Sequence, residues 1–247
     1  QFAFAQTTYV PDDNFEQALI DLGYDDTLDD YVLTANISGV TSLNVSQKEI
    51  SDLTGIEDFI ALTNLQCQDN QLTSLDVSNN TALTLLKCDN GNQITSLDVS
   101  ANTALTSLDC SGNQLTSLDL SSNTALTYLS CAENQLTSLD VSANTALTVL
   151  HCGSNPITSL DVSANTALTT LYCRNNQLTS LDVSSNTALT NLNIGGGSQS
   201  QISTLDVSNN TALTELNTQD IMFLTSLDVS ANTALTNLTV RNCQLTS

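Results

Sequence analysis

One short stretch is repeated along most of this chain. Residues 136–147 read LTSLDVSANTAL, and eight near-copies of this stretch follow one another, mostly at intervals of 21 residues. A fixed period of this length is typical of a solenoid, in which each coil packs only against its neighbours. We therefore expect a long, thin core that grows with every coil. The central Asp of the eight copies is found at Asp76, Asp98, Asp119, Asp140, Asp161, Asp182, Asp206 and Asp228.

A complete coil reads L-T-x-L-x-C-x-x-N-Q-L-T-S-L-D-V-S-x-N-T-A. Its first eleven positions resemble the leucine-rich repeat, LxxLxLxxNxL, with Cys in the third Leu slot. The pattern is similar to the 21-residue bacterial class of this family, and the Cys slot is similar to the cysteine ladder of internalins. The lead-in YVPDDNFEQALIDLG resembles secreted or surface repeat proteins of flavobacteria. The resemblance implies a right-handed, β-rich solenoid with a parallel sheet on its concave face.

The sequence divides into three parts. Residues 1–8 form a terminal segment in which Ala3-x-Ala5 is typical of the end of an export signal. Residues 9–39 form an N-terminal cap with one amphipathic helix over about 12–22, which covers the first coil. Residues 40–247 form about ten coils, and because the last coil stops halfway, we expect the native solenoid to continue. The export signal and the resemblance predict a secreted or surface protein, exported across an outer membrane.

The cysteines are predicted to lie in the core. Their slot follows an inward Leu by two residues, so both side chains point to the same side of a strand. Stacked parallel strands hold equivalent side chains about 4.8 Å apart, too far for a disulfide, and a straight row does not converge on a metal. Val and Ile replace Cys in some coils, which favours packing. The six cysteines in the slot are Cys67, Cys88, Cys110, Cys131, Cys152 and Cys173. Cys243 lies further along its coil, at the position where other coils have Asn.

Two groups of acidic residues suggest cations. Equivalent Asp residues of adjacent coils would lie about 5 Å apart and repel by roughly 0.8 kcal/mol per pair in water. Either hydrogen bonds to the following backbone or a row of bound cations would offset this repulsion. In the cap, the turn containing Asp25, Asp26, Asp29 and Asp30 is either a calcium site or a solvated turn. This turn lacks the Gly and the distal Glu of an EF-hand loop. Apart from calcium, we expect no cofactor in this chain.

Composition excludes several functions. The chain has 26 Asp or Glu against four Lys or Arg, for a net charge of −22. Nucleic acids and anionic membrane surfaces both attract basic segments, so neither partner is expected. No segment approaches the ~18 consecutive apolar residues of a membrane span. We also expect the chain to be a monomer. One His, no nucleophile beside a recognisable base and no glycine-rich phosphate loop give no catalytic constellation, so no enzyme is predicted.

The outward strand positions of the sheet vary from coil to coil, whereas the second half of the coil barely changes. Three of the four cations, the only His and both tyrosines of the repeats fall on this predicted concave face. Exposed aromatic and Arg side chains are typical of binding hot spots and of platforms for stacking sugars. The candidate ligand-binding residues are Lys87, Tyr128, His151, Tyr172 and Arg174.

Three functions remain open from the sequence. The first is an extracellular or cell-surface module that recognises a protein or a carbohydrate through the concave face. The second is a structural or adhesive spacer, which the near-identity of the coils favours. The third is an ice-binding surface, suggested by Thr columns that Ser and Leu neighbours interrupt, such as Thr116, Thr137, Thr158 and Thr179.

Overall fold

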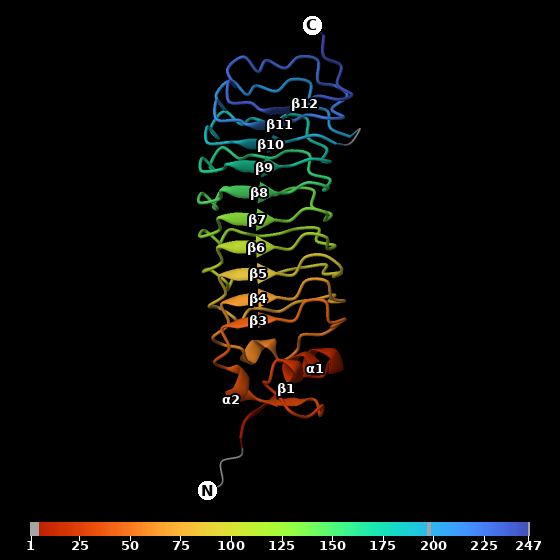
Figure 1. The fold of residues 1–247 in the computed structure, drawn as a ribbon, viewed down its shortest axis with the longest axis vertical. Helices are drawn as coiled ribbons and strands as arrows, with labels where there is room; N and C mark the ends of the chain where they lie inside the picture. The colour runs from red at the N-terminus through yellow and green to blue at the C-terminus, as the bar shows by residue number, and fades with distance from the viewer. Residues whose placement is uncertain (1–4, 197–198, 247) are drawn as a thin grey trace.

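The computed structural model describes residues 5–196 and 199–246, so the Ala3-x-Ala5 motif lies partly outside the described residues. Ten parallel strands, β3 to β12, follow one another in chain order along the length of the molecule and form one sheet (Figure 1). This arrangement confirms the leucine-rich repeat solenoid. The strands are β3 Ser42–Asn44, β4 Asn64–Gln66, β5 Leu85–Lys87, β6 Ser107–Asp109, β7 Tyr128–Ser130, β8 Val149–His151, β9 Thr170–Tyr172, β10 Asn191–Asn193, β11 Glu215–Asn217 and β12 Asn237–Thr239.

The register of the sheet repeats without a slip. Leu65 pairs with Leu86 and Leu150 pairs with Leu171, and every other neighbouring pair follows the same scheme. The middle Leu therefore points inward in each strand and is at most 1% exposed from β3 to β11. Leu238 in β12 is 42% exposed, because no coil among the described residues covers it. The first and third residues of each strand point outward.

The cysteine ladder lies in the core, as predicted. Cys67, Cys88, Cys110, Cys131, Cys152 and Cys173 are all free and at most 1% exposed. Burial raises the pKa of Cys67, Cys131 and Cys173 to about 12, which keeps these thiols neutral and unreactive. Cys243 lies in an Asn slot and makes an Asn-like contact, because its Sγ donates to the carbonyl of Thr218 at 3.1 Å.

Two ladders of buried Asn hold adjacent coils together. The first ladder is formed by the Asn that follows the Cys slot by three or four residues, and within it Asn92 Nδ2 donates to the carbonyls of Cys67 and Cys88, both at 3.1 Å. The equivalent residues Asn70, Asn113, Asn134, Asn155 and Asn176 also bridge two coils. A second ladder, which the sequence analysis missed, consists of the Asn in each Asn-Thr-Ala-Leu. Within it Asn144 Nδ2 donates to the carbonyls of Leu120 at 3.1 Å and Asn123 at 2.9 Å.

The second half of each coil is a series of turns. Asn144 N–H bonds to the carbonyl of Val141, and Leu147 N–H bonds to that of Asn144, which curls the chain twice. The repeated Asp begins each curl: Asp140 Oδ1 accepts the N–H of Ser142 at 2.9 Å. All eight Asp residues make this bond to a following Ser. Hydrogen bonds from that Ser lower the pKa of each carboxyl, and they oppose the repulsion between neighbouring Asp residues.

The N-terminal cap covers one end of the solenoid (Figure 1). Helix α1, Asp13–Asp21, begins as predicted at the N-cap Asp12, whose Oδ1 accepts the N–H groups of Asn14 and Phe15. Phe15 is fully buried against Phe59, with ring centroids 6.4 Å apart. The cap also contains an antiparallel pair, β1 Thr7–Tyr9 and β2 Tyr31–Leu33, then α2 Thr34–Ile37, and a 3-10 turn η1 follows at Ile56–Asp58. Thr7 and Thr8, assigned above to the terminal segment, thus belong to the cap.

Candidate ligand-binding face

The outward side chains of the sheet form two parallel rows, because the strands are in register. We call this surface the sheet face; it is the face predicted to be concave. The first-residue row runs through Leu85, Ser107, Tyr128, Val149, Thr170, Asn191, Glu215 and Asn237, and the third-residue row runs through Lys87, Asp109, Ser130, His151, Tyr172, Asn193, Asn217 and Thr239.

Three of the predicted site residues touch one another on this face. The rings of His151 and Tyr172 are stacked, with centroids 4.7 Å apart and planes 5° from parallel. Tyr128 meets His151 edge-on, with centroids 5.8 Å apart and planes 74° from parallel. Both arrangements are favourable for aromatic pairs and contribute roughly 0.5–1.5 kcal/mol each beyond the area they bury. We call these three half-buried side chains the aromatic cluster.

The two predicted cations, Lys87 and Arg174, are not part of the aromatic cluster. Arg174 is exposed after β9, and its side chain covers Gly153, where an added Cβ would come within 3.0 Å of Arg174 Cγ. Gly153 therefore makes room for the Arg side chain. Lys87 shares the third-residue row with His151, but β6 and β7 lie between their strands. The structure thus brings together the aromatic residues and leaves Lys87 apart.

Two carboxyl groups near Lys87 give this part of the face a negative potential. Asp109 Oδ1 accepts the N–H of Ser111 at 3.2 Å. Burial, and then the charge of Asp109, raise the pKa of Asp89, whose Oδ1 is buried without a donor among the described residues. Burial lowers the pKa of His151, while Asp109 opposes this change. The burial of His151 therefore favours its neutral imidazole.

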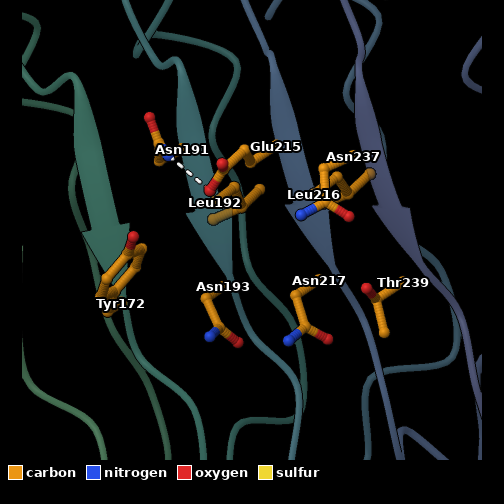
Figure 2. A pocket seen from close by; sticks show the side chains of 9 residues that line it. All are labelled: Tyr172, Asn191, Leu192, Asn193, Glu215, Leu216, Asn217, Asn237 and Thr239. Atoms are coloured by element: carbon orange, nitrogen blue, oxygen red, sulfur yellow. Dashed lines mark hydrogen bonds between the residues drawn. The ribbon is translucent and has the colours of Figure 1, made fainter.

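A shallow cavity lies next to the aromatic cluster, and we call it the Tyr172 cavity. Its empty volume is about 360 Å³, part of which is open solvent. Figure 2 shows the ring of Tyr172 at one end, standing beside Asn193, with the remaining side chains spread over β10, β11 and β12. The lining residues are Tyr172, Asn191, Leu192, Asn193, Glu215, Leu216, Asn217, Asn237 and Thr239.

Known proteins support the repeat assignment. The family profile described as leucine rich repeats (two copies) matches residues 103–144 and 124–165. The solved functional domain of internalin J from Listeria monocytogenes, described as including a cysteine ladder, is 30% identical to this chain. That match covers 100% of this chain and 74% of the solved chain, with a TM-score of 0.64. The chain belongs to the leucine-rich repeat family.

Other relatives agree on the fold and limit what can be carried over. A 73-residue stretch, 30% of this chain, is 44% identical to internalin J of Listeria monocytogenes serotype 4b (strain F2365), but it covers only 8% of that protein. A leucine-rich repeat protein of Leptospira interrogans is 23% identical, with a TM-score of 0.78 over 87% of this chain and 57% of its own. At that identity the likeness concerns the fold alone. The family is a repeat family, and no enzyme family is indicated.

Most residues of the cavity could not be predicted from the sequence. Tyr172 was a candidate because aromatic residues are rare in this chain, whereas Asn191, Asn193 and Asn217 look ordinary in an Asn-rich repeat. Only the register of the strands places these Asn residues beside the exposed ring face of Tyr172. Glu215 was visible as the one acid of the first-residue row, and that was the one available signal.

The acidic turn of the cap gives no compact metal site. Asp29 Oδ1 accepts the N–H of Tyr31, and Thr27 donates to Asp26, so these carboxylates are used locally. Within residues 5–196 and 199–246, no three His, Cys, Asp or Glu side chains are placed to hold a metal ion together. Two buried oxygens, Glu16 Oε2 and Asp25 Oδ2, lack a donor in that part of the chain. Calcium in the cap stays a prediction. No helix of the described residues is long and apolar enough to cross a membrane.

Proposed function

We propose that this chain is an extracellular or cell-surface recognition module whose sheet face binds a protein or a glycan. One observation carries the proposal: the two tyrosines and the one His of the repeats gather in one cluster on the variable face, beside a cavity. Outward aromatic residues expose apolar surface that the fold itself does not require. Large, rigid aromatic side chains are the groups that most often anchor a partner.

The rest of the coil explains why the other faces are poor candidates. The Asp-Ser turns and both Asn ladders are repeated from coil to coil because they satisfy backbone groups. Their side chains are thus committed to the scaffold. The aromatic cluster makes none of those ladder bonds, so its residues are available to a partner.

Glycan and host-protein arrays test the proposal. The wild-type chain is expected to bind at least one class of probe, and the variant Tyr128→Ala/Tyr172→Ala/Arg174→Ala is expected to lose that binding. The control is Ala143→Ser on the opposite side of the coil, which installs the residue that another coil carries at Ser122. Equal binding by the triple variant would contradict the proposal. A wild type that binds no probe on either array would favour a structural spacer.

A further inference from the structure

The two ring faces of Tyr172 have different environments. His151 covers one face, at a centroid distance of 4.7 Å and with nearly parallel planes. Asn193 is the register partner of Tyr172 on the opposite side, so the second face is turned toward β10 and the cavity. Figure 2 shows the ring at the edge of the cavity, with the β10 to β12 side chains on one side of it. The cavity therefore has one flat aromatic wall.

The amides of the cavity are held in fixed orientations. Asn193 Oδ1 accepts the N–H of Gly195 at 3.1 Å, and Asn217 Oδ1 accepts the N–H of Gln219 at 2.9 Å. Within the described part of the chain, neither Nδ2 group donates to a protein acceptor. Because each carbonyl oxygen is fixed by the backbone, each half-exposed NH₂ group is presented in a defined direction and can donate to a ligand.

Glu215 supplies the complementary acceptor. Its Oε2 accepts Asn191 Nδ2 at 2.8 Å, which holds the carboxylate in place across the two strands (Figure 2). A carboxylate has about four acceptor sites and no donor, so most of its capacity remains for a ligand. The cavity thus offers amide donors, a carboxylate acceptor and an aromatic wall within three strand spacings, about 10–15 Å.

We propose that the Tyr172 cavity binds a neutral hexopyranose unit of a glycan. The apolar face of the sugar ring stacks on Tyr172, and its hydroxyl groups bond to Asn193, Asn217 and Glu215. Neighbouring hydroxyls both donate and accept, which matches amides beside a carboxylate. The proposal rests on the proposed function and names the ligand class of the same face.

The negative charge of the cavity and of the whole chain narrows the class of ligand further. Glu215 is the one charged side chain among the residues that line the cavity, and the whole chain carries −22. Sialylated, sulphated and phosphorylated sugars are therefore disfavoured by repulsion. Apolar molecules would leave the amides without partners.

Saturation-transfer NMR with the full chain tests this assignment. The probes are methyl glycosides of glucose, galactose, mannose and N-acetylglucosamine. At least one should receive saturation, and Tyr172→Ala and Asn217→Ala should each weaken its binding by roughly tenfold or more. Asn64→Ala is a matched control on the same face outside the cavity, and it should bind as the wild type does. Circular dichroism melting of every variant separates loss of binding from loss of fold.

Glu215→Gln separates a sugar from a cationic peptide. Gln keeps hydrogen-bonding capacity, so the affinity for the sugar should stay within roughly tenfold of the wild-type affinity. The attraction of a Lys-rich peptide depends instead on the negative charge of Glu215. Binding of that peptide, lost in Glu215→Gln, with no glycoside bound would overturn the proposal. Saturation of acidic glycans alone, or wild-type binding in folded Tyr172→Ala, would also overturn it. If no glycoside binds while the arrays show a protein ligand, the sugar assignment fails and the proposed function stands.

Discussion

His151 and Tyr172 stack face to face, with ring centroids 4.7 Å apart and planes 5° from parallel. The register of β8 and β9 makes this contact, because it places the two residues opposite each other on adjacent parallel strands. The stack buries one face of each ring and leaves the second face of Tyr172 at the cavity. The proposed recognition of a ligand depends on this pair.

His151 should titrate below its ordinary pKa. Burial disfavours the imidazolium and lowers the pKa from 6.5, although Asp109 opposes the effect. Near this pH the folded state then binds fewer protons than the unfolded chain. The contribution of neutral His151 to the free energy of unfolding is therefore complete above pH ~6.5 and is lost as the pH falls through the lowered pKa. His151 is the only His in the chain, so one imidazole NMR signal reports it. A midpoint at or above 6.5 would contradict the buried stack, and Tyr172→Ala should raise the midpoint.

The second Asn ladder should matter for stability. Asn144 is fully buried, and its Nδ2 satisfies the carbonyls of Leu120 and Asn123. Asn144→Ala removes one of the two hydrogen bonds that each carbonyl accepts, since each also accepts a backbone N–H, and we expect a loss of about 1–3 kcal/mol in the free energy of unfolding. Urea unfolding measures the change. Ala143→Ser is the adjacent control and should stay within ~0.5 kcal/mol of the wild type. A loss below about 1 kcal/mol for Asn144→Ala would mean that the ladder is not a stabilising element.

The period of the sequence determines the fold because every coil repeats the same inward residues. Leu and Cys two positions apart must share the inner side of a strand, so the cysteine ladder could be predicted directly. The Asn144 ladder could not, because an Asn before Thr-Ala looks like a surface turn until the next coil is stacked on it. The cavity depends on which side chains the register brings beside Tyr172. Asn193 and Asn217 carry no local signal of that position.

The seven thiols should react in two classes. The six ladder cysteines are buried and neutral, whereas Cys243 is partly exposed. A thiol reagent such as DTNB should therefore modify one thiol quickly in the native protein and the other six only on unfolding. Cys243→Ser should remove the fast phase alone. Rapid native reaction of more than one thiol would contradict the packing of the ladder.

The acidic turn of the cap should behave as a solvated turn. Burial, and to a lesser extent the charge of Glu16, raise the pKa of Asp25, so its folded form loses stability as the pH rises through that pKa. Asp25→Asn should raise the melting temperature at pH 7, and the wild type should melt equally in millimolar calcium and in chelator. A calcium-dependent rise that Asp25→Asn abolishes would establish the cation site instead.

Hydroxyl-radical footprinting of the chain with an array-identified ligand tests the central claim most directly. Tyr128 and Tyr172 lie on the sheet face, while Tyr9 and Tyr31 lie in the cap and serve as internal references. The account predicts that the ligand lowers modification of Tyr128 and Tyr172 and leaves Tyr9 and Tyr31 unchanged. Saturating ligand that protects the cap tyrosines, or that leaves Tyr172 as reactive as in the free chain, would contradict recognition through the sheet face.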